Sequence, residues 1–92
     1  MIRSFGNRES ERLFRRFHSR RFASMERVAF RKLRQIESVA RVEELLEPPG
    51  NRLEKLHGDR DGQWSIRINE QWRICFDWRD GDAWKVEIVD YD

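Results

Sequence analysis

The sequence predicts an α+β fold in which two N-terminal helices pack on one face of an antiparallel sheet. Apolar residues recur at helical spacing in residues 1–46 and alternate with polar residues from residue 64 onward. Between them lies Pro48-Pro49-Gly50, a tripeptide that stops a helix. A chain of 92 residues supports one small core and shows no repeat or linker, so residues 1–92 are expected to form a single domain.

Two helices are predicted in the first half of the chain. Asn7 suits the N-cap of a helix starting at Arg8, because its short polar side chain can accept a hydrogen bond from the first turn. Ser24 is the corresponding candidate for the second helix. The apolar face of the first helix is expected to hold Leu13, Phe14 and Phe17. That of the second is expected to hold Met25, Val28, Ala29, Phe30, Leu33, Ile36 and Ala40.

Shorter elements are predicted around these helices. Met1 to Phe5 is a candidate edge strand, and residues 42–46 form a short turn of helix. The expected strands of the second half are 52–57, 64–68, 72–78 and 84–88. Glycine-containing or polar turns separate them, near Asn69-Glu70 and over residues 79–82.

Alternation along the strands assigns two faces to the predicted sheet. The face expected to pack on the helices carries Ile66, Ile68, Ile74, Phe76, Val86 and Ile88, with Trp84 in the same phase as Val86. The opposite face carries Arg67, Arg73, Lys85, Glu87 and Tyr91. Antiparallel sheets commonly have one packed and one polar face, so functional side chains are expected on the polar one.

Composition argues against membrane-spanning, secreted and disulfide-stabilised proteins. Charged residues make up 39% of the chain, no apolar run approaches the length of a membrane span, and the start lacks a signal-peptide core, so a cytoplasmic location without membrane partners is expected. A single cysteine, Cys75, excludes an internal disulfide and a multi-cysteine zinc site.

Arginine is concentrated in the first half. Residues 1–50 hold 12 Lys and Arg against 7 Asp and Glu, whereas residues 51–92 hold 7 against 10. Arginine suits phosphate recognition, although a solvated helix face is an equally good interpretation of charge alone. The candidates for phosphate contacts are Arg15, Arg16, Arg20, Arg21, Arg31 and Arg34.

Three stretches of the second half carry a resemblance. They read P-P-G-N-R-L-E-K-L (48–56), G-D-R-D-G-Q-W-S-I-R-I-N-E-Q-W-R-I-C-F (58–76) and D-G-D-A-W-K-V-E-I-V-D-Y (80–91). Together they resemble the HigB branch of the RelE-like toxins. The resemblance implies two helices on a twisted antiparallel sheet. It also implies an endoribonuclease, without metal or cofactor, that enters the A site of the 70S ribosome and cuts mRNA there.

The same resemblance implies a partner. This is a HigA-like helix-turn-helix antitoxin that neutralises the toxin and represses the shared operon, so operator DNA is contacted only through the antitoxin. Under this reading, the arginines of the first half would contact ribosomal RNA without reading its sequence.

Arg73 is the first candidate catalytic residue. Metal-free RNA cleavage needs a base for the 2′-hydroxyl, a cation for the phosphate and an acid for the leaving 5′-oxygen. Arg73 stands in W-R-I, where the family keeps an arginine facing the scissile phosphate, and its guanidinium stays charged. The alternative is a strand arginine paired with Glu87 or Asp77.

The C-terminal pair Asp90 and Tyr91 matches the family's D-Y. The phenol could stack on a base or hold the phosphate, and the carboxylate could orient a neighbour or act as base; the alternative is a frayed tail. Many relatives continue with histidine, where this chain has Asp92, a candidate RNA contact. A carboxylate replaces imidazole as a proton carrier near neutral pH only with a large pKa shift.

The remaining candidates surround the motif at 54–57. His57 replaces a lysine of the family pattern and could supply the missing proton transfer, or be a surface histidine without a role. Glu54 is a candidate base, and Lys55 and Arg67 are candidate RNA contacts, with solvated strand charges as the alternative. Because these departures touch proton transfer, a weakly catalytic ribosome-binding module and an antitoxin-binding co-repressor remain open beside the nuclease.

Overall fold

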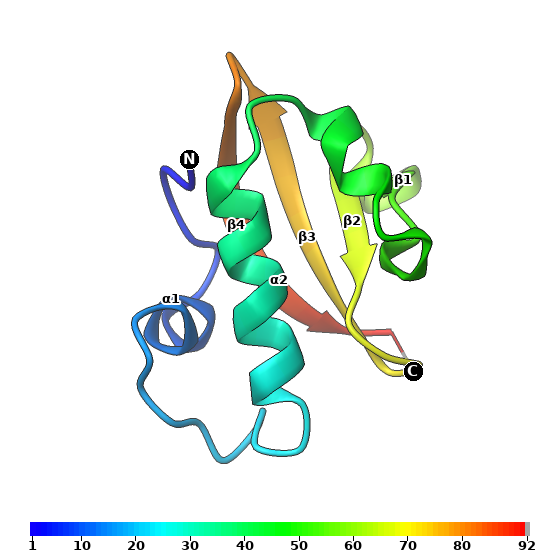
Figure 1. Cartoon of the computed structure of the whole chain (residues 1–92). Coiled ribbons are helices and arrows are strands. Elements are labelled where there is room, and N and C mark those ends of the chain that lie inside the picture. The colour runs from blue at the N-terminus through cyan, green and yellow to red at the C-terminus, as the bar shows by residue number, and fades with distance from the viewer. Residues whose placement is uncertain (92) are drawn as a thin grey trace.

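The computed structural model describes residues 1–91 and has two helices on one face of a four-stranded antiparallel sheet (Figure 1). The helices are α1 (Arg8–Phe14) and α2 (Glu26–Ser38). The strands are β1 (Glu54–Lys55), β2 (Trp64–Arg67), β3 (Trp72–Arg79) and β4 (Asp82–Asp90), in the order β1-β2-β3-β4. Three 3-10 helices are η1 (Val42–Leu46), η2 (Pro49–Asn51) and η3 (Gly58–Arg60). The predicted α+β class is confirmed.

Helix α1 starts as predicted and ends earlier than its apolar pattern indicates. Asn7 Oδ1 accepts a hydrogen bond from the Ser10 amide at 2.9 Å. The helix stops at Phe14, and Arg16 turns the chain with a positive φ of 67°. Phe17 therefore lies outside the helix and is half exposed, which corrects the prediction that it shares the face of Leu13 and Phe14.

Helix α2 starts without the predicted serine cap. Its N-cap position is Met25, with no side-chain capping bond, and Ser24 lies in the preceding turn. Met25 is buried in the core, so packing holds the first turn where a capping hydrogen bond was expected. The helix ends at Ser38, which leaves Ala40 outside it and exposed. Lys32 is buried on this helix, and its ammonium donates to the Arg67 carbonyl at 2.6 Å.

The core lies between the helices and the sheet. α2 contributes Ala29, Leu33 and Ile36 to it, all fully buried. The predicted inward strand residues are buried as well: Ile66, Ile68, Ile74, Phe76, Val86 and Ile88. Phe22, from the α1–α2 connection, meets Trp72 edge to face at 5.3 Å between ring centroids. No helix within residues 1–91 is both long and apolar enough to cross a membrane.

A bulge in β4 corrects one part of the predicted alternation. β3 and β4 are joined by Asp80-Gly81, both with positive φ, as a type I′ hairpin turn requires. Further along, Cys75 pairs with Glu87 but Asp77 pairs with Trp84, so β4 holds one extra residue there. Lys85 absorbs it with a φ of 53°. Trp84 therefore faces away from Val86, on the side of the sheet opposite the helices.

The first strand is much shorter than the predicted 52–57. β1 is only Glu54–Lys55, which pairs with Ser65 and Trp64 of β2. Arg52 adopts a left-handed conformation with φ 46° after η2, and the chain turns again after Leu56 into η3. Two turns in close succession leave room for only two paired residues.

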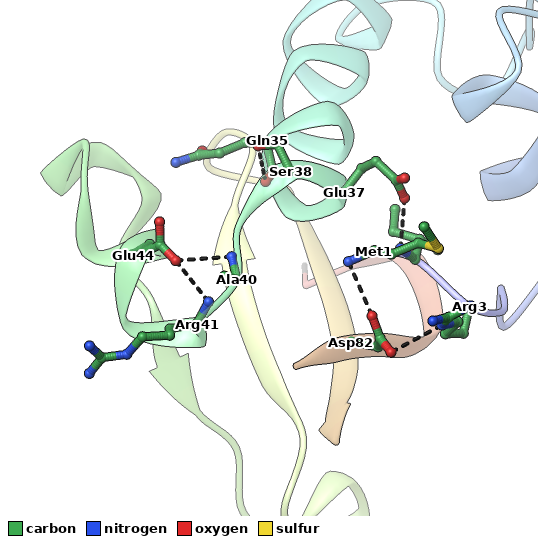
Figure 2. A network of polar contacts seen from close by, with 10 residues as sticks. Met1, Arg3, Gln35, Glu37, Ser38, Ala40, Arg41, Glu44 and Asp82 are labelled. Atoms are coloured by element: carbon green, nitrogen blue, oxygen red, sulfur yellow. Dashed lines mark hydrogen bonds and ion pairs between the residues drawn. The ribbon is translucent and has the colours of Figure 1, made fainter. Parts of the chain in front are cut away.

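The N-terminal segment lies along the free edge of β4, but it forms two isolated bridges and not the edge strand predicted for Met1 to Phe5. Ile2 and Phe5 form parallel bridges with Ala83 and Val86. Figure 2 shows how this segment is fixed: Asp82 binds the Met1 ammonium at 3.4 Å and Arg3 Nε at 3.0 Å, and the amide of residue 2 donates to Glu37 at 2.7 Å. The sheet edge beside Glu87 is thereby covered.

Candidate functional site

The candidate site is built on the sheet face opposite the helices. Ser65, Cys75 and Glu87 stand side by side across β2, β3 and β4, because Cys75 pairs with both of the other two. Ser65 and Cys75 are fully buried. This corrects the expectation of an open polar face: side chains from neighbouring segments cover its centre, and two small residues form the floor beneath them.

Arg73 lies beside this floor and is held by three residues. Its Nε donates to Ser65 Oγ at 2.8 Å, and its Nη2 donates to the Arg52 carbonyl at 2.8 Å. Nη2 also lies 3.4 Å from Glu54 Oε1. Arg73 is only 8% exposed, yet it is outside the hydrophobic core and on the predicted face. Its partner is Glu54, whereas the alternative considered from sequence named Glu87 or Asp77.

Tyr91 lies over Arg73. The guanidinium carbon of Arg73 is 5.5 Å from the centre of the Tyr91 ring, within cation–π range, and the residue is 48% exposed. The tail is tied to the β2–β3 turn, because the Tyr91 amide donates to the Gln71 carbonyl at 2.7 Å. Gln71 Nε2 also donates to Asp90 Oδ2 at 3.0 Å. These two bonds account for an ordered tail where fraying was the alternative.

The electrostatics of the site favour the neutral, protonated forms of the Tyr91 phenol and the Cys75 thiol. Burial raises the pKa of the Tyr91 phenol, the nearby Cys75 raises it further, and the charge of Arg73 opposes the shift. Burial likewise raises the pKa of the Cys75 thiol against the opposing charge of Arg60. At neutral pH the phenol is therefore a proton donor and the thiol is uncharged.

Arg60 and Glu87 complete the cluster. Arg60 Nη1 lies 2.8 Å from Glu87 Oε1 and donates to Gln63 Oε1 at 3.0 Å. Burial is the largest single influence and lowers the pKa of Arg60. The hydrogen bond to Glu87 and the charges of Cys75, Glu87 and Tyr91 together outweigh it, so the pKa is raised. Sequence reasoning treated residues 58–62 as a loop and did not single out Arg60. An arginine between two aspartates and two glycines was the only available signal.

The other predicted residues are spread around this cluster. Glu54 lies within it, half exposed beside Arg73. His57 is 87% exposed, and its Nδ1 lies 3.8 Å from Asp61 Oδ1, so its ion-pair partner is a neighbour in η3 and its flanking turn. Lys55 lies over the Trp64 ring at 5.6 Å. Arg67 Nε donates to the Asn69 carbonyl at 3.1 Å. The predicted RNA contact Asp92 lies outside the described residues.

The candidate arginines for phosphate contacts lie in α2 or in the segment that joins α1 to α2, and these make up the helical side of the molecule. Arg16 stacks over Phe30 at 4.8 Å and Arg34 over Phe14 at 5.4 Å. Arg21 pairs with Glu9 at 3.2 Å. None of these recorded contacts, all within residues 1–91, reaches the Arg73 cluster. In the same part of the chain, no three His, Cys, Asp or Glu side chains gather in a way that could hold a metal ion.

Comparison with known proteins decides the family. Residues 3–92 match the family of HigB-like toxins, described as RelE-like toxins of type II toxin–antitoxin systems. The chain belongs to the HigB-like toxin family. The match covers both α1 and the sheet face that carries Arg73 and Tyr91.

Two curated HigB relatives are similar to parts of this HigB-like chain. Toxin HigB-1 of Vibrio cholerae serotype O1 is 44% identical over 61 residues, which are 66% of this chain and 64% of the relative. Endoribonuclease HigB of Proteus vulgaris is 45% identical over 40 residues, which are 44% of each protein. The chain thus spans less than two thirds of the length of either relative.

Proposed function

We propose that this HigB-like protein is a ribosome-dependent mRNA endonuclease toxin. The observation that carries the proposal is the fixed guanidinium of Arg73, held 3.4 Å from the Glu54 carboxylate and 5.5 Å beneath the exposed Tyr91 ring. Cleavage by the 2′-hydroxyl needs a cation, a base and an acid, and the guanidinium, the carboxylate and the neutral phenol can serve in these three roles. The family, and a relative named as an endoribonuclease, support the choice of RNA as substrate.

In this proposal Arg73 stabilises the phosphate as the 2′-oxygen attacks phosphorus. Negative charge grows on the non-bridging oxygens at that moment, and a cation already in place lowers the barrier without reorganising. Ser65 and the Arg52 carbonyl hold the guanidinium at 2.8 Å each, so its direction is set before the RNA arrives. Tyr91 covers it, and a base stacked on that ring would bring its phosphate to the arginine.

Glu54 and Tyr91 are the proposed proton carriers. The exposed carboxylate of Glu54 takes the proton of the 2′-hydroxyl. The phenol of Tyr91, kept neutral by burial and by Cys75, which together raise its pKa, gives its proton to the leaving 5′-oxygen. The 2′-oxygen forms a bond to phosphorus as the 5′-oxygen leaves, which gives a 2′,3′-cyclic phosphate and a 5′-hydroxyl. Asp90, bonded to Gln71, is proposed to position the tail.

The partners follow from the family. We propose that a HigA-like antitoxin neutralises the protein, and that operator DNA is reached only through the antitoxin. We place the action in the cytoplasm, at the A site of 70S ribosomes, where Lys55, Arg67 and the exposed arginines of the helical side would contact RNA phosphates. His57, turned toward Asp61, is proposed to act at most as an RNA contact.

The test is controlled expression followed by mapping of mRNA ends. Wild-type protein is expected to slow growth and produce new mRNA ends within codons, only on translated messages. Arg73→Ala is expected to abolish both, and Tyr91→Phe, which keeps the ring and removes the acidic hydrogen, to reduce them. Normal growth and unchanged mRNA ends with well-folded wild type would disprove the nuclease.

A second candidate, a ribosome-binding module with weak catalysis, is favoured by one observation. Arg73 is already bound by Ser65, Arg52 and Glu54 and is 8% exposed, so the phosphate must compete for it. Purified protein on programmed ribosomes separates the two candidates. Binding with slow cleavage that Glu54→Gln accelerates indicates that Glu54 restrains the arginine, and binding without cleavage in either protein removes the enzyme. Tight antitoxin binding without ribosome binding would instead indicate a co-repressor.

A further inference from the structure

We propose that Arg60 is a second phosphate-binding residue of this site and holds the RNA backbone next to the scissile link. The inference rests on the proposed function for its substrate, and on the Arg60, Glu87 and Gln63 contacts for its position. It assigns a role to a side chain that the cleavage steps above do not use.

The geometry places Arg60 on the sheet from outside it. Arg60 ends η3, a segment that follows the edge strand β1, yet its guanidinium lies 2.8 Å from Glu87 of β4, at the opposite side of the sheet. The η3 segment thus brings Arg60 to the same face of the sheet as Cys75 and Glu87. Its charge acts on both the Cys75 thiol and the Tyr91 phenol, as that of Arg73 does. Both guanidinium groups therefore lie near Tyr91 and Cys75.

Arg60 is the more accessible of the two arginines. Its side chain is 36% exposed, compared with 10% for Arg73. Both of its recorded contacts, to Glu87 and Gln63, are made by Nη1. A guanidinium carries five N–H donors, so Arg60 retains donors for the paired oxygens of a phosphate. A buried arginine suits charge that develops during the reaction, whereas an exposed one suits a phosphate that is charged throughout.

Gly6 leaves space for the side chain of Glu87, whose carboxylate binds the Arg60 guanidinium. A Cβ atom at Gly6 would lie 3.0 Å from Glu87 Cβ, Cδ and Oε2. The Gly6 amide donates to the Val86 carbonyl at 2.8 Å, which fixes the glycine against β4. A larger residue there would press on Glu87, the residue whose carboxylate binds Arg60 Nη1. The N-terminal segment therefore contributes to the site without touching the RNA.

The first test does not depend on catalysis. Inorganic phosphate is titrated into ¹⁵N-labelled wild-type protein, and the side-chain Nε–H signals of Arg60 and Arg41 are followed by NMR. Arg41, exposed and paired with Glu43 at 3.1 Å, is the matched control on another part of the surface. The Arg60 signal, identified by its loss in Arg60→Lys, is expected to shift saturably before that of Arg41. Equal responses of the two signals would overturn the proposal.

The second test separates binding from chemistry. Single-turnover cleavage of mRNA on programmed ribosomes is measured against protein concentration for wild type, Arg60→Ala, Arg60→Lys and Arg41→Ala. Loss of one charge-assisted phosphate contact is expected to raise the half-saturating concentration of Arg60→Ala by roughly tenfold and leave the plateau rate nearly unchanged. Arg60→Lys is expected to recover part of the loss, and Arg41→Ala to match wild type.

The outcomes distinguish the two proposals. An unchanged half-saturation, or a lower plateau alone, would refute Arg60 as a binding residue while the nuclease stands. If wild type cuts nothing, the nuclease fails and the phosphate titration alone decides Arg60. Thermal unfolding of Arg60→Ala shows whether the variant is folded. Because the titration uses wild-type protein, an unstable variant still leaves the proposal open to refutation.

Discussion

The arginines of the helical side and those of the sheet face carry the same charge but are held differently. Arg16 and Arg34 rest on partly buried phenylalanine rings, through cation–π contacts without a hydrogen bond, within residues 1–91, to fix their direction. Arg73 is directed by a buried serine and a backbone carbonyl, both at 2.8 Å, and Arg60 by a carboxylate and an amide. A site that must place charge at one point of a reaction requires the second kind of arginine. The density of arginine in the first half therefore did not indicate where the chemistry is expected.

The largest expected effect is on the cleavage rate, when Arg73→Ala is compared with Arg34→Ala. Removing one preorganised donor from a site that stabilises developing charge costs about 10²–10³-fold in rate. We expect that loss in the plateau cleavage rate of Arg73→Ala on programmed ribosomes, with Arg34→Ala within about twofold of wild type. A comparable loss in the two variants would remove the distinction between fixed and loosely held arginines.

A smaller effect is expected on stability when the support of Arg73 is removed. Ser65→Ala deletes the buried hydroxyl that accepts from Arg73 Nε at 2.8 Å, and leaves a buried donor unpaired. We expect a loss of about 1–3 kcal/mol in the free energy of unfolding, measured by urea denaturation. The control is Ser38→Ala, which deletes an exposed hydroxyl bonded to the Gln35 carbonyl and should cost less than about 0.5 kcal/mol. Equal losses would show that Arg73 is not held through Ser65.

Alkaline pH should lower the stability of the folded protein through two groups of the sheet face. Burial raises the pKa of Cys75 from 9.0 and that of Tyr91 from 10.0. Because both folded-state values lie above the unfolded ones, the stabilisation is complete below about pH 9 and is lost as pH rises through the folded-state pKa values. Urea denaturation at increasing pH should show falling stability, less steep in Tyr91→Phe. Phenolate absorbance appearing at the pH of free tyrosine would contradict the shift.

The smallest effect is expected for the ring-stacked arginines. Arg16→Ala removes the stack on Phe30 at 4.8 Å, an exposed cation–π contact worth about 0.5–1 kcal/mol. Urea denaturation should show that loss. If these arginines bind phosphates of ribosomal RNA, removing Arg16 and Arg34 together should also weaken ribosome binding and reduce the dependence of the affinity on salt concentration. Unchanged salt dependence would leave them as solvated charges.

Periodic features of the fold were predictable from the sequence, and local irregularities were not. The apolar stripe of α2 and the inward strand residues are confirmed because burial imposes a period on the sequence. The bulge at Lys85 and the left-handed Arg52 arise from residues with no special preference for positive φ, so tertiary contacts decide them. The start of α2 was misplaced for a similar reason, since Met25 is fixed by packing and not by a cap.

The candidate site was likewise predictable in part: its periodic features could be read from the sequence, and its non-local contacts could not. Strand phase and the family motif placed Arg73 and Tyr91 on the correct face, and the structure brings the two together. Arg60 was missed because its position depends on a carboxylate 27 positions further along the chain, a separation that no local pattern reveals. His57 had a suitable chemistry, but the turn into η3 directs it to Asp61. Residue type indicated candidates, and the contacts that bring Arg73, Tyr91 and Arg60 together link segments far apart in the sequence.

The turn between β2 and β3 determines where the C-terminal tail lies. Asn69 Oδ1 accepts hydrogen bonds from the amides of Gln71 and Trp72, both at 2.9 Å. The carbonyl of Gln71 in turn accepts the hydrogen bond from the Tyr91 amide. A substitution at Asn69 can therefore retune the reach of the phenol while every residue of the cluster keeps its identity. A remote position of this kind would allow the proposed activity to be adjusted in small steps, by evolution or by protein engineers.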